Sequence, residues 1–67
     1  MKYEDFRKTI EEGLRASPGG LTWEELRTRL RLPYDRACPE WTRRLEREIG
    51  LRREKRTGRA FVWSIFR

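Results

Sequence analysis

The apolar residues of this chain change their spacing at Gly50. Upstream of Gly50 they recur every three or four positions, which is typical of helices with one buried face. Downstream, Phe61, Trp63 and Ile65 occupy alternate positions, which is typical of a strand with one buried face. We therefore expect a single α+β domain over residues 1–67, in which helices come first and strands follow Gly50.

Two helices are expected before Pro33. The first covers residues 3–16, and the Ser-Pro-Gly-Gly run that follows ends it. Its apolar stripe consists of Tyr3, Phe6, Ile10 and Leu14. The second helix begins at Thr22, because Thr22 and Glu25 have the spacing of a capping box. Pro33 should end this helix near Leu32.

A third helix and a hairpin complete the expected fold. The helix covers residues 39–49, with a proline in its first turn and Gly50 as its C-cap. Residues 51–56 and 60–66 are expected to form a two-stranded antiparallel hairpin around a Thr-Gly turn. The expected core contains Trp41, Leu45, Phe61 and Trp63.

The positive charge is concentrated in the second half of the sequence. Residues 1–30 contain six basic and six acidic side chains, so their charges cancel. Residues 31–67 contain eleven basic and five acidic side chains, and this difference is the whole net charge of +6. A basic excess on one part of a small domain is typical of proteins that bind a polyanion.

The composition argues against several classes of site. Cys38 is the single cysteine and there is no histidine, so we expect no disulfide, no metal site and no cysteine nucleophile with a histidine base. The carboxylates have the spacing of helix-surface ion pairs, so we expect neither enzymatic activity nor a cofactor. No run of about twenty apolar residues and no signal-peptide core is present. We therefore expect a cytoplasmic protein without a membrane partner.

Three segments of the sequence resemble the winged helix-turn-helix family of DNA-binding domains. GLTWEELRTRLRLP is similar to the second helix of that family, EWTRRLEREIGLRRE to its third helix and first wing strand, and RTGRAFVWSI to its wing tip and returning strand. The resemblance covers residues 3–65 and implies that residues 39–49 form a recognition helix and residues 51–66 a wing. Winged helices also serve as protein-interaction modules, so the fold alone does not decide the partner.

The third helix is expected to expose a basic face opposite its apolar stripe, which consists of Trp41, Leu45 and Ile49. At about 100° per residue, this face and its flanks consist of Glu40, Arg43, Arg44 and Arg47. The resemblance implies that this face lies in the major groove of double-stranded DNA, where arginine donates to guanine or phosphate oxygens. The alternative is a solvated helix whose charges pair as Glu40–Arg44, Arg44–Glu48 and Arg43–Glu46. The chain has no Asn or Gln, so bidentate recognition of adenine by those side chains is excluded.

The hairpin is expected to neutralise phosphates. The residues assigned to this role are Arg53, Lys55, Arg56 and Arg59. Basic residues on an exposed strand also discourage edge-to-edge aggregation, but two or three would be enough for that purpose. The sequence therefore predicts a small DNA-binding domain, a transcription regulator or a DNA-associated accessory factor. The alternatives are a protein-interaction module that docks an acidic partner, and a domain that binds structured RNA. Since no helix is left over for dimerisation, we expect a monomer.

Overall fold

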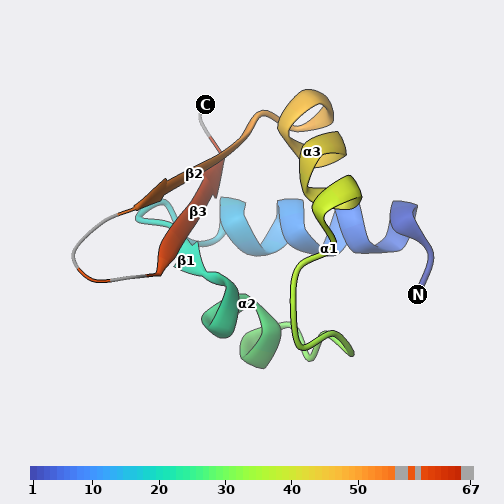
Figure 1. Cartoon of the computed structure of the whole chain (residues 1–67), viewed down its shortest axis with the longest axis horizontal. Coiled ribbons are helices and arrows are strands. Elements are labelled where there is room, and N and C mark those ends of the chain that lie inside the picture. The colour runs from blue at the N-terminus through green and yellow to red at the C-terminus, as the bar shows by residue number, and fades with distance from the viewer. Residues whose placement is uncertain (56–57, 59, 66–67) are drawn as a thin grey trace.

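The computed structural model describes residues 1–55, 58 and 60–65, and in these residues it contains three α-helices and three β-strands (Figure 1). The helices are α1 (Tyr3–Arg15), α2 (Trp23–Arg29) and α3 (Pro39–Glu48). The strands are β1 (Leu21–Thr22), β2 (Leu51–Lys55) and β3 (Phe61–Ile65). The expected α+β class is confirmed, as is the antiparallel pairing of the two strands that follow α3.

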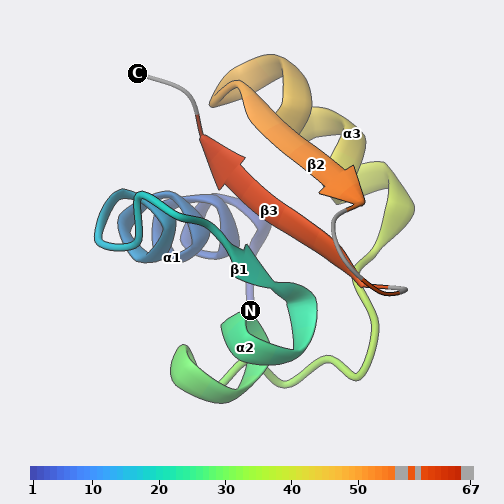
Figure 2. The same cartoon turned by 90° about the vertical axis from the view of Figure 1, so that its left-hand side faces the viewer.

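The sheet contains a third strand, so the prediction of a two-stranded sheet is wrong. The strand order is β1-β3-β2, with β3 in the middle (Figure 2). Strand β2 pairs antiparallel with β3, and β1 pairs antiparallel with the other edge of β3 through Leu21–Trp63 and Thr22–Val62. Because β1 is two residues long, it is too short to show the alternating pattern by which strands are recognised in a sequence.

Gly20 allows β1 to approach β3. Its φ of +87° lies in the left-handed region that favours glycine. A Cβ atom at this position would lie 2.6 Å from Cγ1 of Val62 and 2.8 Å from the carbonyl oxygen of Trp63. The Gly-Gly run therefore separates α1 from β1 and also leaves the space that β1 needs beside β3.

Helix α2 ends before the position that Pro33 predicts. The helix stops at Arg29, and the N–H of Leu32 donates to the carbonyl of Arg27 at 3.0 Å. Arg31 has a φ of +53°. A bond across six residues with a left-handed residue inside it is the Schellman pattern that ends many helices. Glycine usually occupies the left-handed position. Because this chain has Arg31 there, the turn could not be predicted from the sequence.

The core forms around the apolar stripe of α1. Phe6, Ile10 and Leu14 have exposed fractions of 2% or less, as their helical spacing predicts. From the other elements, the buried apolar residues packed with them are Leu21, Leu26, Leu32, Leu45, Leu51 and Trp63. All three helices and the sheet therefore contribute to one core.

Phe61 does not belong to this core, although the alternation along β3 placed it there. Trp63 and Leu45 are buried and Trp41 packs half-buried against them, but 49% of Phe61 is exposed. Phe61 is the first residue of β3 and pairs with Lys55 at the far end of the hairpin. Alternation predicts the face on which a side chain lies, but not how far along the strand the covering helices extend.

The start of α2 has both hydrogen bonds of the expected capping box. The N–H of Glu25 donates to Oγ1 of Thr22 at 3.2 Å, and the N–H of Thr22 donates to Oε1 of Glu25 at 2.9 Å. The extended backbone of Thr22 serves as the N-cap conformation and as the last position of β1. Thr22 therefore joins the sheet to α2.

We predict that Thr22→Ala lowers the free energy of unfolding by about 1 kcal/mol, because an N–H at the start of α2 loses its acceptor. Thr28→Ala is the matched control, since Thr28 lies exposed within the same helix and caps nothing. Urea denaturation of the parent and both variants measures the effect. Equal midpoints for Thr22→Ala and the parent would contradict the role of this cap.

Candidate nucleic-acid interface

Helix α3 lies on the surface with one side fixed against the core. Thr42 and Leu45 are buried, with exposed fractions of 3% and 0%. The Thr42 hydroxyl donates to the carbonyl of Cys38 at 2.8 Å, so its burial leaves no polar atom without a partner. The expected stripe named Trp41 and Ile49 in place of Thr42, and both are half-buried. Thr42 was not expected in the buried stripe, because a hydroxyl counts as polar in an apolar pattern.

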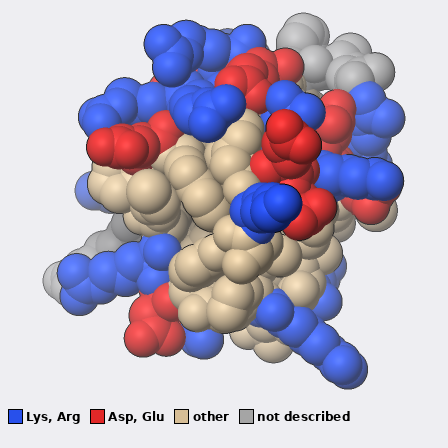
Figure 3. Space-filling model, turned by 90° about the vertical axis from the view of Figure 1, so that its right-hand side faces the viewer, with Lys and Arg blue, Asp and Glu red and all other residues tan. Residues whose placement is uncertain are grey.

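The opposite side of α3 forms an exposed, mainly basic surface. We call it the α3 face; it is lined by Glu40, Arg43, Arg44, Glu46 and Arg47. Figure 3 views the side of the molecule on which α3 lies, and Lys and Arg side chains gather in the upper part of this view with acidic side chains among them. The structure therefore brings together the four residues that the sequence predicted for the recognition helix.

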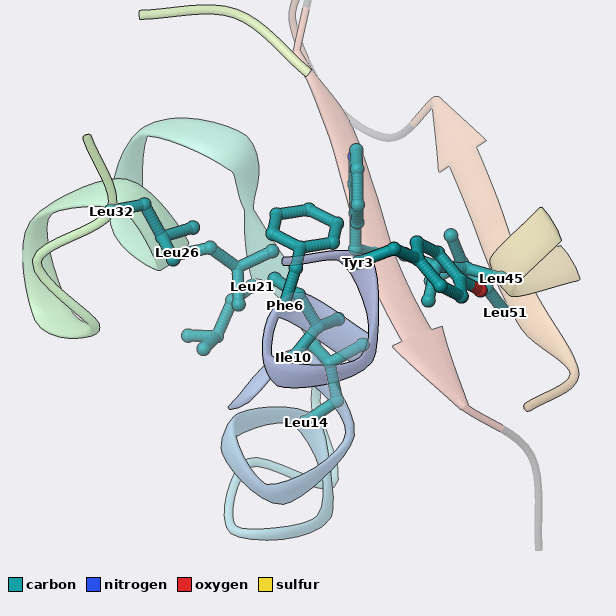
Figure 4. Close-up of a cluster of buried hydrophobic side chains, with 10 residues drawn as sticks. Tyr3, Phe6, Ile10, Leu14, Leu21, Leu26, Leu32, Leu45 and Leu51 are labelled. Carbon is teal, nitrogen blue, oxygen red and sulfur yellow. The ribbon is translucent and has the colours of Figure 1, made fainter. Parts of the chain in front are cut away.

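Glu48 connects α3 to α1. Its Oε1 accepts hydrogen bonds from the Tyr3 hydroxyl at 3.1 Å and from Arg7 at 2.7 Å, and its Oε2 accepts one from Nε of Arg44 at 3.2 Å. Tyr3 extends from the start of α1 towards Leu45 and Leu51 (Figure 4). The contacts of Tyr3 and Arg7 with Glu48 could not be expected from local spacing, because 41 or more positions separate them in the sequence.

These contacts shift two pKa values in opposite directions. The hydrogen bond from Arg7 lowers the pKa of Glu48, and those from Tyr3 and Arg44 act in the same direction, since all three favour the charged carboxylate. Burial raises the pKa of the Tyr3 hydroxyl, and its bond to Glu48 raises it further. At neutral pH the contact therefore joins a charged Glu48 to a protonated Tyr3.

Arg44 contacts other side chains of the protein. Its guanidinium carbon lies 3.8 Å from the centre of the Tyr3 ring, within the range of a cation–π contact, while its Nε is bonded to Glu48. Glu40 has a different position, in the first turn of α3, where a negative charge is favoured by the helix dipole. These two residues flank the exposed arginines of the α3 face.

Two of the three glutamates of α3 pair with arginines of other elements. Glu46 accepts a hydrogen bond from Arg53 of β2 at 3.2 Å, and Glu48 pairs with Arg7 of α1 as well as with Arg44. Of the three ion pairs expected within α3, Arg44–Glu48 is present. In the described part of the chain, Arg43 and Arg47 have no carboxylate partner. They are therefore available to an external anion.

The predicted wing residues have different surroundings. The guanidinium carbon of Arg53 lies 6.0 Å from the ring centres of both Phe61 and Trp63. Lys55 is exposed at the end of β2. The predicted phosphate contacts Arg56 and Arg59 lie outside the described residues. Of the four, the structure thus places Arg53 and Lys55 on one strand next to α3.

No family model matches the chain, and comparisons with curated proteins and with solved structures gave no match either. No helix in the described residues has the length and apolar character needed to cross a bilayer.

The lowered pKa of Glu48 predicts a pH-dependent stability. A carboxyl whose pKa is lower in the folded than in the unfolded state stabilises the fold above its ordinary value of 4.5. That contribution is lost as the pH falls through the folded pKa. We therefore expect the parent to be more stable than Glu48→Gln near neutral pH, and this difference to vanish in acid.

Denaturation of the parent and Glu48→Gln at a series of pH values tests this expectation. Arg7→Met is the companion variant, because it removes the largest cause of the shift and should raise the pKa of Glu48 in an NMR titration. A stability difference that stays constant between neutral and acid pH would show that the charge of Glu48 contributes nothing.

Proposed function

We propose that this chain is a winged-helix domain that binds double-stranded DNA through the α3 face and the β2–β3 hairpin, as a transcription regulator or DNA-associated accessory protein. Three helices precede the hairpin, and β1 extends its sheet. The third helix exposes arginines beside that hairpin. This order of elements supports the assignment of α3 as the recognition helix and the hairpin as the wing.

The observation that carries the proposal is that Arg43 and Arg47 have no carboxylate partner among the described residues. They lie four residues apart on α3, so their like charges destabilise an isolated helix by a few tenths of a kcal/mol. Because Glu46 and Glu48 pair elsewhere, the protein does not neutralise this repulsion within the described residues. A bound polyanion would neutralise it, which makes the α3 face better suited to binding than to stabilising the helix.

The geometry of α3 and the chemistry of arginine favour the major groove of DNA. That groove admits an α-helix, and a guanidinium can donate two hydrogen bonds to O6 and N7 of guanine. We assign base recognition to Arg43 and Arg47. Glu40 and Arg44 flank them. Because the guanidinium of Arg44 contacts Tyr3, we assign Arg44 a smaller contribution to base recognition than Arg43 and Arg47.

The wing would follow the phosphate backbone. Arg53 is bonded to Glu46, which holds β2 beside the α3 face, and Lys55 extends this basic surface along the strand. Arg56 and Arg59, which lie outside the described residues, follow Lys55 in the sequence and are assigned the same role. Contacts of this kind set affinity and orientation and carry little sequence information.

We predict that Arg47→Ala weakens binding by about 1–3 kcal/mol on a guanine-containing site selected from a random duplex pool, and by less on random duplex. The double variant Arg56→Ala/Arg59→Ala should weaken binding to all duplexes about equally. It should also lower the salt slope by roughly one for each lost phosphate contact. Binding isotherms at several salt concentrations measure both effects.

Arg29→Ala is the control of equal charge loss for Arg47→Ala, because Arg29 is exposed in the last turn of α2 and is not part of the α3 face. It should bind much like the parent. If the helix and wing variants all bind like the parent, the basic surface is only solvated, and docking to an acidic protein becomes the better explanation. Preferential competition by structured RNA would instead point to RNA as the partner.

A further inference from the structure

We infer that a groove beside the hairpin binds an unpaired nucleotide, so that the protein recognises a junction between duplex and single-stranded DNA. This inference rests on the proposed function and specifies its substrate further. The groove has a volume of about 410 Å³ and lies between the start of α2, the connection before α3 and the hairpin. The lining residues on which the inference depends are Trp23, Arg36, Arg53 and Phe61.

Phe61 supplies a stacking surface. Nearly half of this side chain is exposed, in a position that neither the core nor the pairing of β3 requires. An aromatic ring in water can stack on the face of a nucleobase of any sequence. Within a duplex the faces of internal bases are already covered by their neighbours. A base that stacks on Phe61 therefore has to be unpaired or at the end of a helix.

The wall of the groove opposite the hairpin is held in place by a second aromatic residue. The indole N–H of Trp23 donates to the carbonyl of Asp35 at 3.0 Å, and the Trp23 ring lies 5.3 Å from that of Trp63. The polar atom of Trp23 is thus satisfied before any ligand binds. The groove therefore presents a preorganised aromatic wall, which reduces the cost of ordering on binding.

The charges around the groove favour a nucleotide over an apolar peptide. Arg36 and Arg53 both line it, and Arg36 has no carboxylate partner in the described residues. The single acidic residue among those lining the groove, Glu24, is paired with Arg27. Aromatic rings together with guanidinium groups match a base and its phosphate, whereas an apolar segment would need no cations.

The groove is continuous with the α3 face. Arg53 lines the groove and is bonded to Glu46, which lines the α3 face. The two surfaces therefore share an edge at this ion pair. A single strand leaving a duplex bound at α3 would meet the groove there, with its phosphates near Arg53 and its first unpaired base near Phe61.

The test compares a blunt duplex with the same duplex carrying a short single-stranded overhang at either end. The parent should bind one of the overhang duplexes about tenfold more tightly than the blunt duplex. Phe61→Ala and Phe61→Leu should lose this preference and bind the blunt duplex like the parent. Phe61→Tyr should keep the preference, because it retains the ring. Circular dichroism checks that each variant folds.

The outcomes separate this inference from the proposed function. If the parent binds the blunt duplex and gains nothing from an overhang, the junction inference is wrong and the duplex proposal stands. If Phe61→Leu keeps the preference, apolar burial rather than stacking accounts for it, and the inference is also wrong. If the parent binds neither DNA, the proposed function itself fails.

Discussion

The arrangement of charge on the α3 face depends on which arginines pair with Glu46 and Glu48, near the end of α3. Glu48 accepts hydrogen bonds from α1, and Glu46 accepts one from β2. Exposed ion pairs of this kind contribute little free energy, because water and salt screen them. These pairs instead determine where the charges lie. They hold the carboxylates of Glu46 and Glu48 at the flanks of α3, so that Arg43 and Arg47 are the basic residues on its outward side. Burial of Leu45 and Thr42 holds the helix, and the glutamates determine which charges remain exposed.

Strand β3 links this helix to the rest of the molecule. It pairs with β1 on one edge and with β2 on the other, so Trp63 lies between Leu21 and Arg53 in the sheet. One side of the hairpin therefore joins the core through Trp63, while its far end extends beyond the helices and exposes Phe61. The same strand thus contributes both to stability and to the groove proposed for an unpaired base.

Local signals allowed most of the fold to be predicted, and contacts between distant residues account for what was missed. Thr22 and Glu25 predicted the start of α2, because a capping box depends on neighbouring residues alone. Strand β1 was missed because its pairing with Val62 and Trp63 is tertiary. The charges of the α3 face and the Arg44–Glu48 pair followed from helical spacing. The pairs with Arg7 and Arg53 did not, because these arginines lie on other elements.

The absence of Asn and Gln limits how a protein of this composition can discriminate among DNA sequences. On the proposed function, arginine supplies the base contacts, and guanine is the base that a bidentate guanidinium reads best. Two arginines on one helix face then distinguish few sequences, while the excess of basic residues raises affinity for every duplex. Recognition of whether the DNA is paired or unpaired would add selectivity that these contacts lack. On the junction inference, a base stacked on Phe61 would be chosen because it is unpaired, whatever its identity. The groove and the α3 face would then read different properties of one DNA molecule.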